Sequence, residues 1–220
     1  MKKYDVVLFD LDGTIIDSGE GVLNSVKYAL KYYGAPIPEY ETLRKFMGPP
    51  LFASFKEICG FPDVQAREAI DIYREYYQDK GIHENTVYEG MSQLIADLKE
   101  SGKQVIVATS KPEKFAEIIL EELGIAKHFT YIAGADMAET RVDKEAVLEY
   151  ALETCGITDR SKIVMVGDRK FDIIGAKMLG LDSIGVLFGY GDRPELESEG
   201  ATYIVETANE LRKLLLGTEC

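Results

Sequence analysis

The chain has 220 residues, of which 46% are hydrophobic and 29% are charged, and this composition excludes disordered and disulfide-scaffold proteins. Its formal net charge of -13 disfavours binding to nucleic acid polymers or to anionic membrane surfaces. No apolar stretch is long enough for a membrane span or a signal peptide, and the three cysteines form no metal-binding clip. We therefore expect a cytoplasmic monomer or homodimer that acts on a small molecule.

The first predicted strand covers residues 4–9, and a helical region follows it. Four helical patterns succeed one another without a convincing strand between them, at residues 18–33, 39–46, 51–59 and 63–78. Their many tyrosines and phenylalanines favour a helix-bundle core over a substrate-facing aromatic wall, although both interpretations remain open. We predict that residues 16–85 form an inserted helical domain, separate from residues 1–15 and 86–220.

After residue 86, short apolar runs alternate with amphipathic helical patterns. The predicted strands are residues 104–109, 129–133, 162–166 and 182–186, and the predicted helices are residues 91–100, 112–123, 144–155 and 171–179. Strands that alternate with helices indicate a parallel sheet with helices on both faces. The predicted fold class is α/β, a Rossmann-like core with a small helical insertion.

Two acidic residues follow the first strand in the sequence Asp10-Leu11-Asp12-Gly13-Thr14. Ligands of parallel sheets bind at the carboxyl ends of the strands, so both carboxylates are expected in a site. Gly13 and Thr14 are expected to offer amide and hydroxyl donors to an anion. An ordinary strand-ending turn is the alternative interpretation of this segment.

A second acidic pair, Asp168 and Asp172, follows the predicted strand at residues 162–166. Four carboxylates without neighbouring cysteine or histidine favour a hard cation such as Mg²⁺. Asp168 alone could instead be a helix N-cap. The intervening Arg169 and Lys170 either add positive charge to the site or are solvated residues at a helix start, and we favour the second.

Anion-binding residues are predicted between the two acidic pairs. Thr109 and Ser110 end a predicted strand and precede a helix, whose N-terminus can offer hydroxyl and amide groups to a phosphate. Lys144, which opens another predicted helix, could supply a compensating positive charge. Together these residues predict that a cation and a phosphate are held at one site.

The order of these four motifs resembles the haloacid dehalogenase superfamily of phosphohydrolases, and the helical insertion resembles its small cap domain. The resemblance implies that Asp10 is a nucleophile that becomes an aspartyl phosphate and that Asp12 is the general acid and base. Thr109 would hold the phosphoryl group, and Lys144 would orient Asp10. Asp168 would bind Mg²⁺ with Asp10 and the carbonyl of Asp12, whereas Asp172 would act through water or indirectly.

The resemblance is greatest to phosphoglycolate-phosphatase-like members, and it implies a small phosphorylated metabolite as substrate, either phosphoglycolate or a nucleoside 5'-monophosphate. Arg44 and Lys45 are the predicted substrate contacts of the cap, and ordinary surface charge is the alternative interpretation of this pair. A sugar-phosphate mutase is disfavoured because Glu20 and residues 49–51 stand where similar mutases carry a histidine and an arginine. A phospho-accepting signalling module is disfavoured because the phosphoacceptor of receiver domains lies on a later strand.

Overall fold

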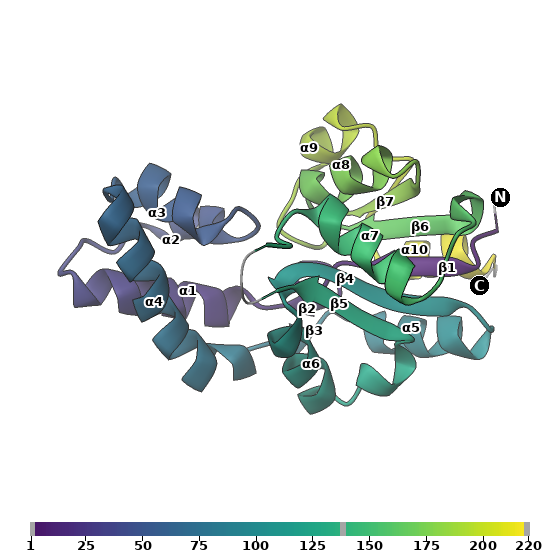
Figure 1. Ribbon diagram of the computed structural model, residues 1–220, viewed down its shortest axis with the longest axis horizontal. Helices are drawn as coiled ribbons and strands as arrows, with labels where there is room; N and C mark the ends of the chain where they lie inside the picture. The colour runs from purple at the N-terminus through teal and green to yellow at the C-terminus, as the bar shows by residue number, and fades with distance from the viewer. Residues whose placement is uncertain (1–2, 137–139, 218–220) are drawn as a thin grey trace. The chain divides into compact units, whose positions relative to one another are not determined.

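The computed structural model describes residues 3–136 and 140–217, and the chain divides into two compact units (Figure 1). One unit consists of Met1–Ile16 and Val87–Cys220, and the other is Asp17–Thr86. The first unit contains a parallel sheet and the second contains helices. Cys220, one of the three cysteines, lies outside the described residues.

The sheet of the first unit has six parallel strands in the order β5-β4-β1-β6-β7-β8. The strands are β1 (Val6–Phe9), β4 (Gln104–Pro112), β5 (Tyr131–Ala135), β6 (Ile163–Gly167), β7 (Asp182–Val186) and β8 (Tyr203–Val205). Strand order reverses at β1, because the chain adds β4 and β5 on one side before it crosses to β6 on the other. Ligand sites of α/β proteins lie at such a reversal, outside the carboxyl ends of the strands.

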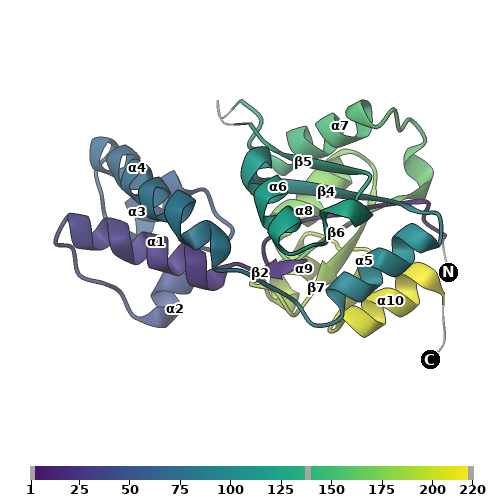
Figure 2. The same cartoon turned by 90° about the horizontal axis from the view of Figure 1, so that it is seen from below.

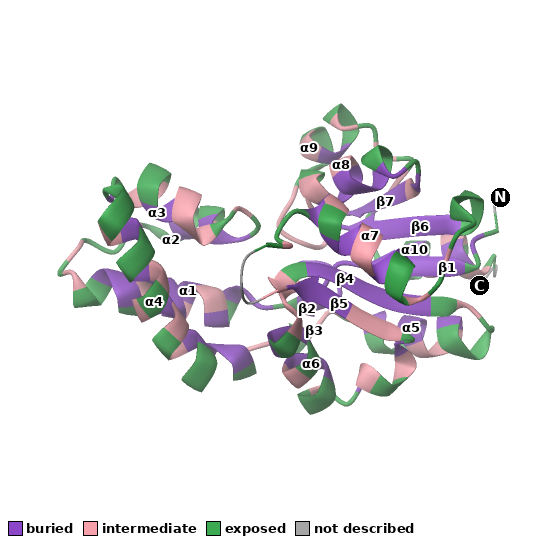
Figure 3. Ribbon diagram, in the orientation of Figure 1, coloured by how far each residue is buried: buried purple, intermediate pink, exposed green. Residues whose placement is uncertain are grey.

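Helices cover both faces of this sheet (Figures 1 and 2). One face carries α5 (Met91–Glu100), α6 (Glu113–Glu122) and α10 (Ala208–Leu216), and the other carries α7 (Lys144–Thr154), α8 (Lys170–Met178) and α9 (Arg193–Ser198). Every residue of the central strands β1 and β6 is buried (Figure 3). On β1, Val6 and Leu8 join the core beneath α7 and α8, while Val7 and Phe9 alternate with them. This burial explains the continuous apolar run at the start of the sequence.

The second unit consists of α1 (Gly19–Tyr32), α2 (Tyr40–Leu43), α3 (Leu51–Cys59) and α4 (Asp63–Asp79). Its aromatic residues pack on one another, since the rings of Phe55 and Phe61 stack at 5.9 Å and those of Tyr73 and Tyr77 at 5.6 Å. All four of these rings are buried. For them, the helix-bundle interpretation of the aromatic pattern is therefore confirmed. Two short strands, β2 (Ile16–Asp17) and β3 (Thr86–Val87), pair where the chain passes between the units.

The α/β fold class is confirmed, but several predicted elements are wrong in detail. The sequence predicted five strands in the sheet and missed β8, which has only three residues, as well as α9 and α10. The helix predicted at residues 39–46 is divided into α2 and a 3-10 turn, Arg44–Phe46, which tightens the chain before Gly48 and Pro49. Single 3-10 turns also occur at Gly81–His83, Ala126–His128 and Arg160–Lys162. None of the described helices is both long and apolar enough to cross a membrane.

Candidate active site

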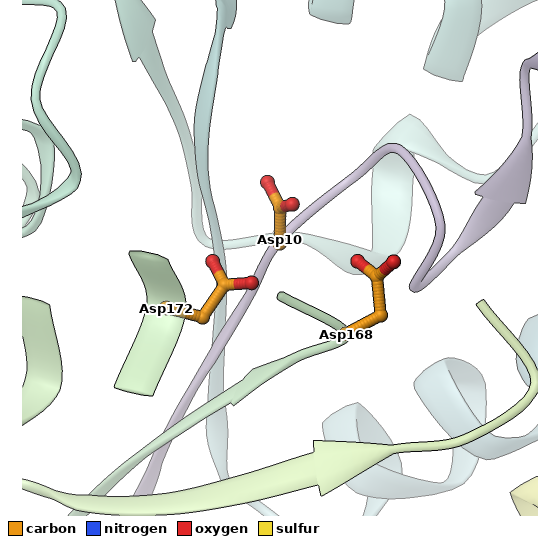
Figure 4. Close-up of side chains that lie close together, drawn as sticks. All are labelled: Asp10, Asp168 and Asp172. Carbon is orange, nitrogen blue, oxygen red and sulfur yellow. The ribbon is translucent and has the colours of Figure 1, made fainter. Parts of the chain in front are cut away.

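Three buried aspartates converge at the carboxyl edge of the sheet (Figure 4). Asp10 follows β1 and Asp168 follows the neighbouring strand β6, while Asp172 lies in the first turn of α8. The backbone N–H of Asp10 donates to Val166 O at 2.9 Å, which continues the β1–β6 pairing to the site. One carboxylate oxygen from each residue lies within 4.8 Å of the other two. Asp12 is not in this group.

Asp168 is held by hydrogen bonds and by close backbone packing. Its Oδ1 accepts from the Thr14 hydroxyl at 3.2 Å, and its Oδ2 accepts from the backbone N–H of Tyr190 at 2.8 Å. Gly13 has a φ of 78°, and a Cβ placed there would lie 2.3 Å from Asp168 Oδ2. A Cβ on Gly189 would lie 2.5 Å from the Asp168 Cβ. Only glycine therefore fits at either position.

Lys144 links the aspartates from the N-terminus of α7. Its Nζ lies 2.7 Å from Asp10 Oδ1 and 2.9 Å from Asp172 Oδ1, and it also donates to Ala108 O at 3.0 Å. The side chain is 5% exposed, so these three oxygens replace its hydration. The second oxygen of Asp172 accepts from the backbone N–H of Arg169 at 3.1 Å. Asp172 is thus engaged by two protein groups.

Burial of several carboxylates in one place disfavours their charged forms. Burial, reinforced by Asp172 and Asp12 but opposed by Lys144, raises the pKa of Asp10 to about 6. Burial and the neighbouring Asp172 and Asp10 raise the pKa of Asp168 well above its usual range. Burial alone would lower the pKa of Lys144, but the two carboxylates outweigh it and raise that pKa. The three buried carboxylates thus outnumber the single ammonium group of Lys144.

The donor set of this site fits a hard divalent cation. Asp10, Asp168 and Asp172 offer only carboxylate oxygens, which Mg²⁺ prefers over the nitrogen and sulfur ligands of zinc. A cation there would also stabilise the ionised carboxylates whose pKa values burial raises. Both the ligand chemistry and the electrostatics therefore support a metal site, in which the carbonyl of Asp12 stays a predicted ligand.

A β-bulge at the end of β4 brings Thr109 and Lys111 to the same edge. β4 continues past its predicted end at residue 109 to Pro112, and its register against β5 shifts between Ala108 and Pro112. Thr109 is buried, and its Oγ1 accepts from the backbone N–H of Lys111 at 3.1 Å. Ser110, predicted to bind an anion with Thr109, is exposed.

Lys111 is a site residue that the sequence reasoning missed. Its Nζ lies 2.6 Å from Asp12 Oδ1, and its side chain is only 8% exposed. The sequence did show Lys111 directly after Thr109 and Ser110, but a lone lysine is usually solvated. The bulge instead places the Lys111 side chain beside Asp12. No periodicity in the sequence predicts a bulge of this kind.

Two predicted anion donors have other partners in the structure. The Thr14 hydroxyl donates to Asp168, and the backbone N–H of Gly13 donates to Ile16 O at 2.8 Å. Both residues shape the turn that carries Asp10 and Asp12. Contact of Gly13 or Thr14 with an anion stays a prediction. The Gly13 hydrogen bond closes the turn itself, whereas the Thr14 hydrogen bond joins the turn to Asp168 after β6.

The favoured solvated interpretation of Arg169 is wrong. The Arg169 side chain is 17% exposed, and its Nε donates to Glu195 Oε1 at 2.9 Å. The same carboxylate oxygen accepts from the backbone N–H of Lys170 at 2.8 Å, so Glu195 of α9 ties down the start of α8. Arg169 therefore stabilises the loop that carries Asp168.

The predicted cap contacts lie in the helical unit. Arg44 is partly exposed, with its NH1 4.0 Å from Glu41 Oε2 and its guanidinium 6.0 Å from the Tyr40 ring centroid. Lys45 is exposed. Contact of these two residues with a substrate stays a prediction.

Comparison with known proteins places this geometry in a family. The family described as haloacid dehalogenase-like hydrolase matches residues 7–186. A 5'-nucleotidase from Pseudomonas aeruginosa is 37% identical over 97% of this chain and 96% of its own length. The tyrosine-protein kinase PtkA of Mycobacterium tuberculosis is 38% identical over 96% of this chain and 72% of its own length. A phosphoglycolate phosphatase from Colwellia psychrerythraea is 27% identical over 96% of each chain.

A solved structure from Clostridium acetobutylicum, described as a "predicted phosphatase", has the same fold. The match spans 99% of this chain and 100% of the other, with 43% sequence identity and a TM-score of 0.92.

Proposed function

This chain belongs to the haloacid dehalogenase-like hydrolases and is a phosphoric monoester hydrolase, and on that premise we propose that it uses Mg²⁺ and an aspartyl-phosphate intermediate to hydrolyse a small phosphate monoester. The observation that carries the proposal is the buried group of Asp10, Asp168 and Asp172, with Lys144 paired to Asp10.

Asp10 is the proposed nucleophile. A carboxylate oxygen of Asp10 attacks phosphorus, the bond from phosphorus to the ester oxygen breaks, and an aspartyl phosphate forms. Lys144, 2.7 Å from Asp10 Oδ1, fixes the orientation of the carboxylate and keeps it ionised. Thr109, on strand β4 next to β1, and the N-terminus of α6, which follows that strand, are the proposed donors to the phosphoryl oxygens.

Asp12 is the proposed acid and base. The protonated form gives its proton to the departing ester oxygen in the first half-reaction. The resulting carboxylate then takes a proton from a water molecule, whose oxygen attacks phosphorus and releases inorganic phosphate and free Asp10. Asp12 is two residues from Asp10 on the same turn, and it is excluded from the three-aspartate group, which leaves it available for proton transfer.

Asp10, Asp168 and the carbonyl of Asp12 would hold Mg²⁺ directly, and Asp172 would act through water or through Lys144. When bound, the cation neutralises charge on the carboxylates and on the phosphate, so that a dianionic substrate is not repelled.

Phosphoglycolate and nucleoside 5'-monophosphates are the proposed substrates, with the helical unit as the cap that selects between them. The support is that a 5'-nucleotidase and a phosphoglycolate phosphatase are relatives that match nearly the whole chain. Arg44 and Lys45 of the helical unit are the proposed contacts for a second anionic group of the substrate.

A metal-dependence assay followed by a substrate panel tests this function. We expect p-nitrophenyl phosphate hydrolysis with Mg²⁺, complete loss in excess chelator and recovery when Mg²⁺ is restored. Among phosphate monoesters, one of the two proposed classes should give the highest kcat/KM, because specificity is expressed in that ratio. Full activity in excess chelator would refute the metal dependence.

The same assay separates the other activities. A sugar-phosphate mutase would return the phosphoryl group to the sugar and release little inorganic phosphate. A signalling module would retain the aspartyl phosphate without turnover. An activity like that named for PtkA would transfer phosphate from ATP to tyrosine, which labelled ATP would reveal.

A further inference from the structure

Lys111 forms an ion pair with Asp12 that is buried on the lysine side. The Nζ of Lys111 lies 2.6 Å from Asp12 Oδ1, with side-chain exposures of 8% and 28%. A lysine this far from solvent has lost most of the hydration of its charge and requires a compensating group. Within the described part of the chain, Lys111 is the residue whose side chain binds the Asp12 carboxylate. The pair thus differs from an incidental contact between solvated side chains.

The β-bulge holds Lys111 in place. Ala108 pairs with Ala133 and Pro112 pairs with Ala135, so three residues of β4 stand opposite one residue of β5. Bulges redirect side chains and occur beside active sites. Here the backbone N–H of Lys111 donates to Thr109 Oγ1 at 3.1 Å and closes the bulge. The lysine is therefore connected to two proposed active-site residues, Thr109 through its backbone and Asp12 through its side chain.

Resting on the proposed function, we propose that Lys111 is a positioning residue for Asp12. It holds Asp12 Oδ1 and leaves Oδ2 as the oxygen that gives a proton to the departing ester oxygen and later takes one from the attacking water. Such transfers require the two heavy atoms to approach within about 2.6–3.2 Å. A partly exposed aspartate without a partner would rotate among several rotamers and would seldom meet this requirement.

The two buried lysines therefore have separate tasks. Lys144 contacts Asp10 and Asp172 and acts on the nucleophile. Lys111 contacts Asp12 and acts on proton transfer. Loss of Lys144 should prevent formation of the aspartyl phosphate. Loss of Lys111 should leave that step possible for a substrate with a good leaving group and should slow hydrolysis of the intermediate.

Rapid-mixing kinetics with p-nitrophenyl phosphate separate these steps, since its leaving group needs little protonation. For Lys111→Met with Mg²⁺ we expect a burst of p-nitrophenolate near one equivalent, followed by a steady-state rate lower than that of the wild type by about 10²-fold or more. Lys111→Arg should recover part of this loss, because a guanidinium can also hold a carboxylate oxygen. The Tm of Lys111→Met and its increase on addition of Mg²⁺ should match the wild type.

Lys162→Met is the matched control, since it removes an ion pair of similar length, 2.9 Å to Asp5, from an exposed position. It should have wild-type kinetics. If Lys111→Met does not fold, Lys111→Gln serves for the same measurement.

A wild-type steady-state rate in the Lys111 variant would overturn the proposal. So would loss of the burst together with turnover, because Lys111 would then act in phosphate binding. Asp12→Ala, measured in the same experiment, distinguishes failure of the Lys111 proposal from failure of the proposed function. If Asp12→Ala keeps the wild-type rate, or the wild type forms no phosphoenzyme, the proposed function itself fails.

Discussion

The two ends of the same strands carry similar ion pairs in opposite surroundings. At the carboxyl edge Lys144 lies 2.7 Å from Asp10, with side-chain exposures of 5% and 13%. At the amino edge, before β6 and β1, Lys162 lies 2.9 Å from Asp5, with exposures of 56% and 63%. The distances are alike, but water screens only the second pair. Burial therefore distinguishes the ion pair of the proposed active site from an ordinary surface contact.

Asp10→Asn should have the largest effect on activity, and a small effect would contradict the contrast between the two edges of the sheet. The amide cannot attack phosphorus, so we expect kcat for p-nitrophenyl phosphate to fall by at least ~10⁴-fold. The matched variant Asp5→Asn removes the corresponding carboxylate at the amino edge and should retain wild-type kcat. Near-normal turnover of Asp10→Asn would remove this residue from the mechanism.

Lys144→Met should lower both activity and stability. It leaves Asp10 and Asp172 buried without their cation, which costs about 3–5 kcal/mol in the free energy of unfolding of the metal-free protein. Denaturant unfolding measures this loss, and we expect kcat to fall together with the burst of p-nitrophenolate. Lys162→Met should unfold like the wild type. Equal destabilisation by the two variants would show that burial does not determine the strength of these pairs.

The change of stability with pH should be the smallest of these effects, and it tests the charge state of the buried carboxylates directly. The pKa of Asp10 is raised to about 6 from 3.8, and that of Asp168 is raised also, so the folded metal-free protein binds these protons more tightly than the unfolded chain. Stability should therefore increase as the pH falls from 8 to 5. Mg²⁺ favours the ionised carboxylates, so it should raise Tm more at pH 8 than at pH 5.

Thermal unfolding of the wild type, Asp168→Asn and Asp5→Asn, each with and without chelator, checks this expectation. Asp168→Asn should reduce the dependence on pH, and Asp5→Asn should keep it. If the metal-free wild type loses stability between pH 8 and pH 5, the inferred charge state of the site is wrong.

Most of the core fold was predictable because its strands are short, apolar and separated by amphipathic helices. The apolar runs before Asp10 and Asp168 became β1 and β6, which are neighbours in the sheet. The edge strand β8 escaped prediction because a run of only three residues, Tyr203–Val205, carries too little periodicity. Strand β4 was predicted too short because its bulge interrupts the regular pattern.

The sequence predicted which residues lie in the site better than it predicted which partner each of their groups contacts. Asp10, Asp168, Asp172 and Lys144 were predicted from their places after strands or at a helix start, and the structure brings them together. The Gly13 N–H and the Thr14 hydroxyl were expected to bind an anion, and in the structure they donate to Ile16 O and to Asp168. Such competition among nearby partners depends on three-dimensional distances.

The class of the core, the order of its main strands along the chain and the acidic residues after two of them could all be predicted from the amino-acid pattern. The folded arrangement was needed to show which three carboxylates lie together and which one pairs with Lys111. The physical reason is that periodicity and residue type report local conformation and burial. The partner of a charged side chain depends on strand register, on a bulge and on distances between segments about 100 residues or more apart, as Lys111 and Asp12 are separated by 99 positions.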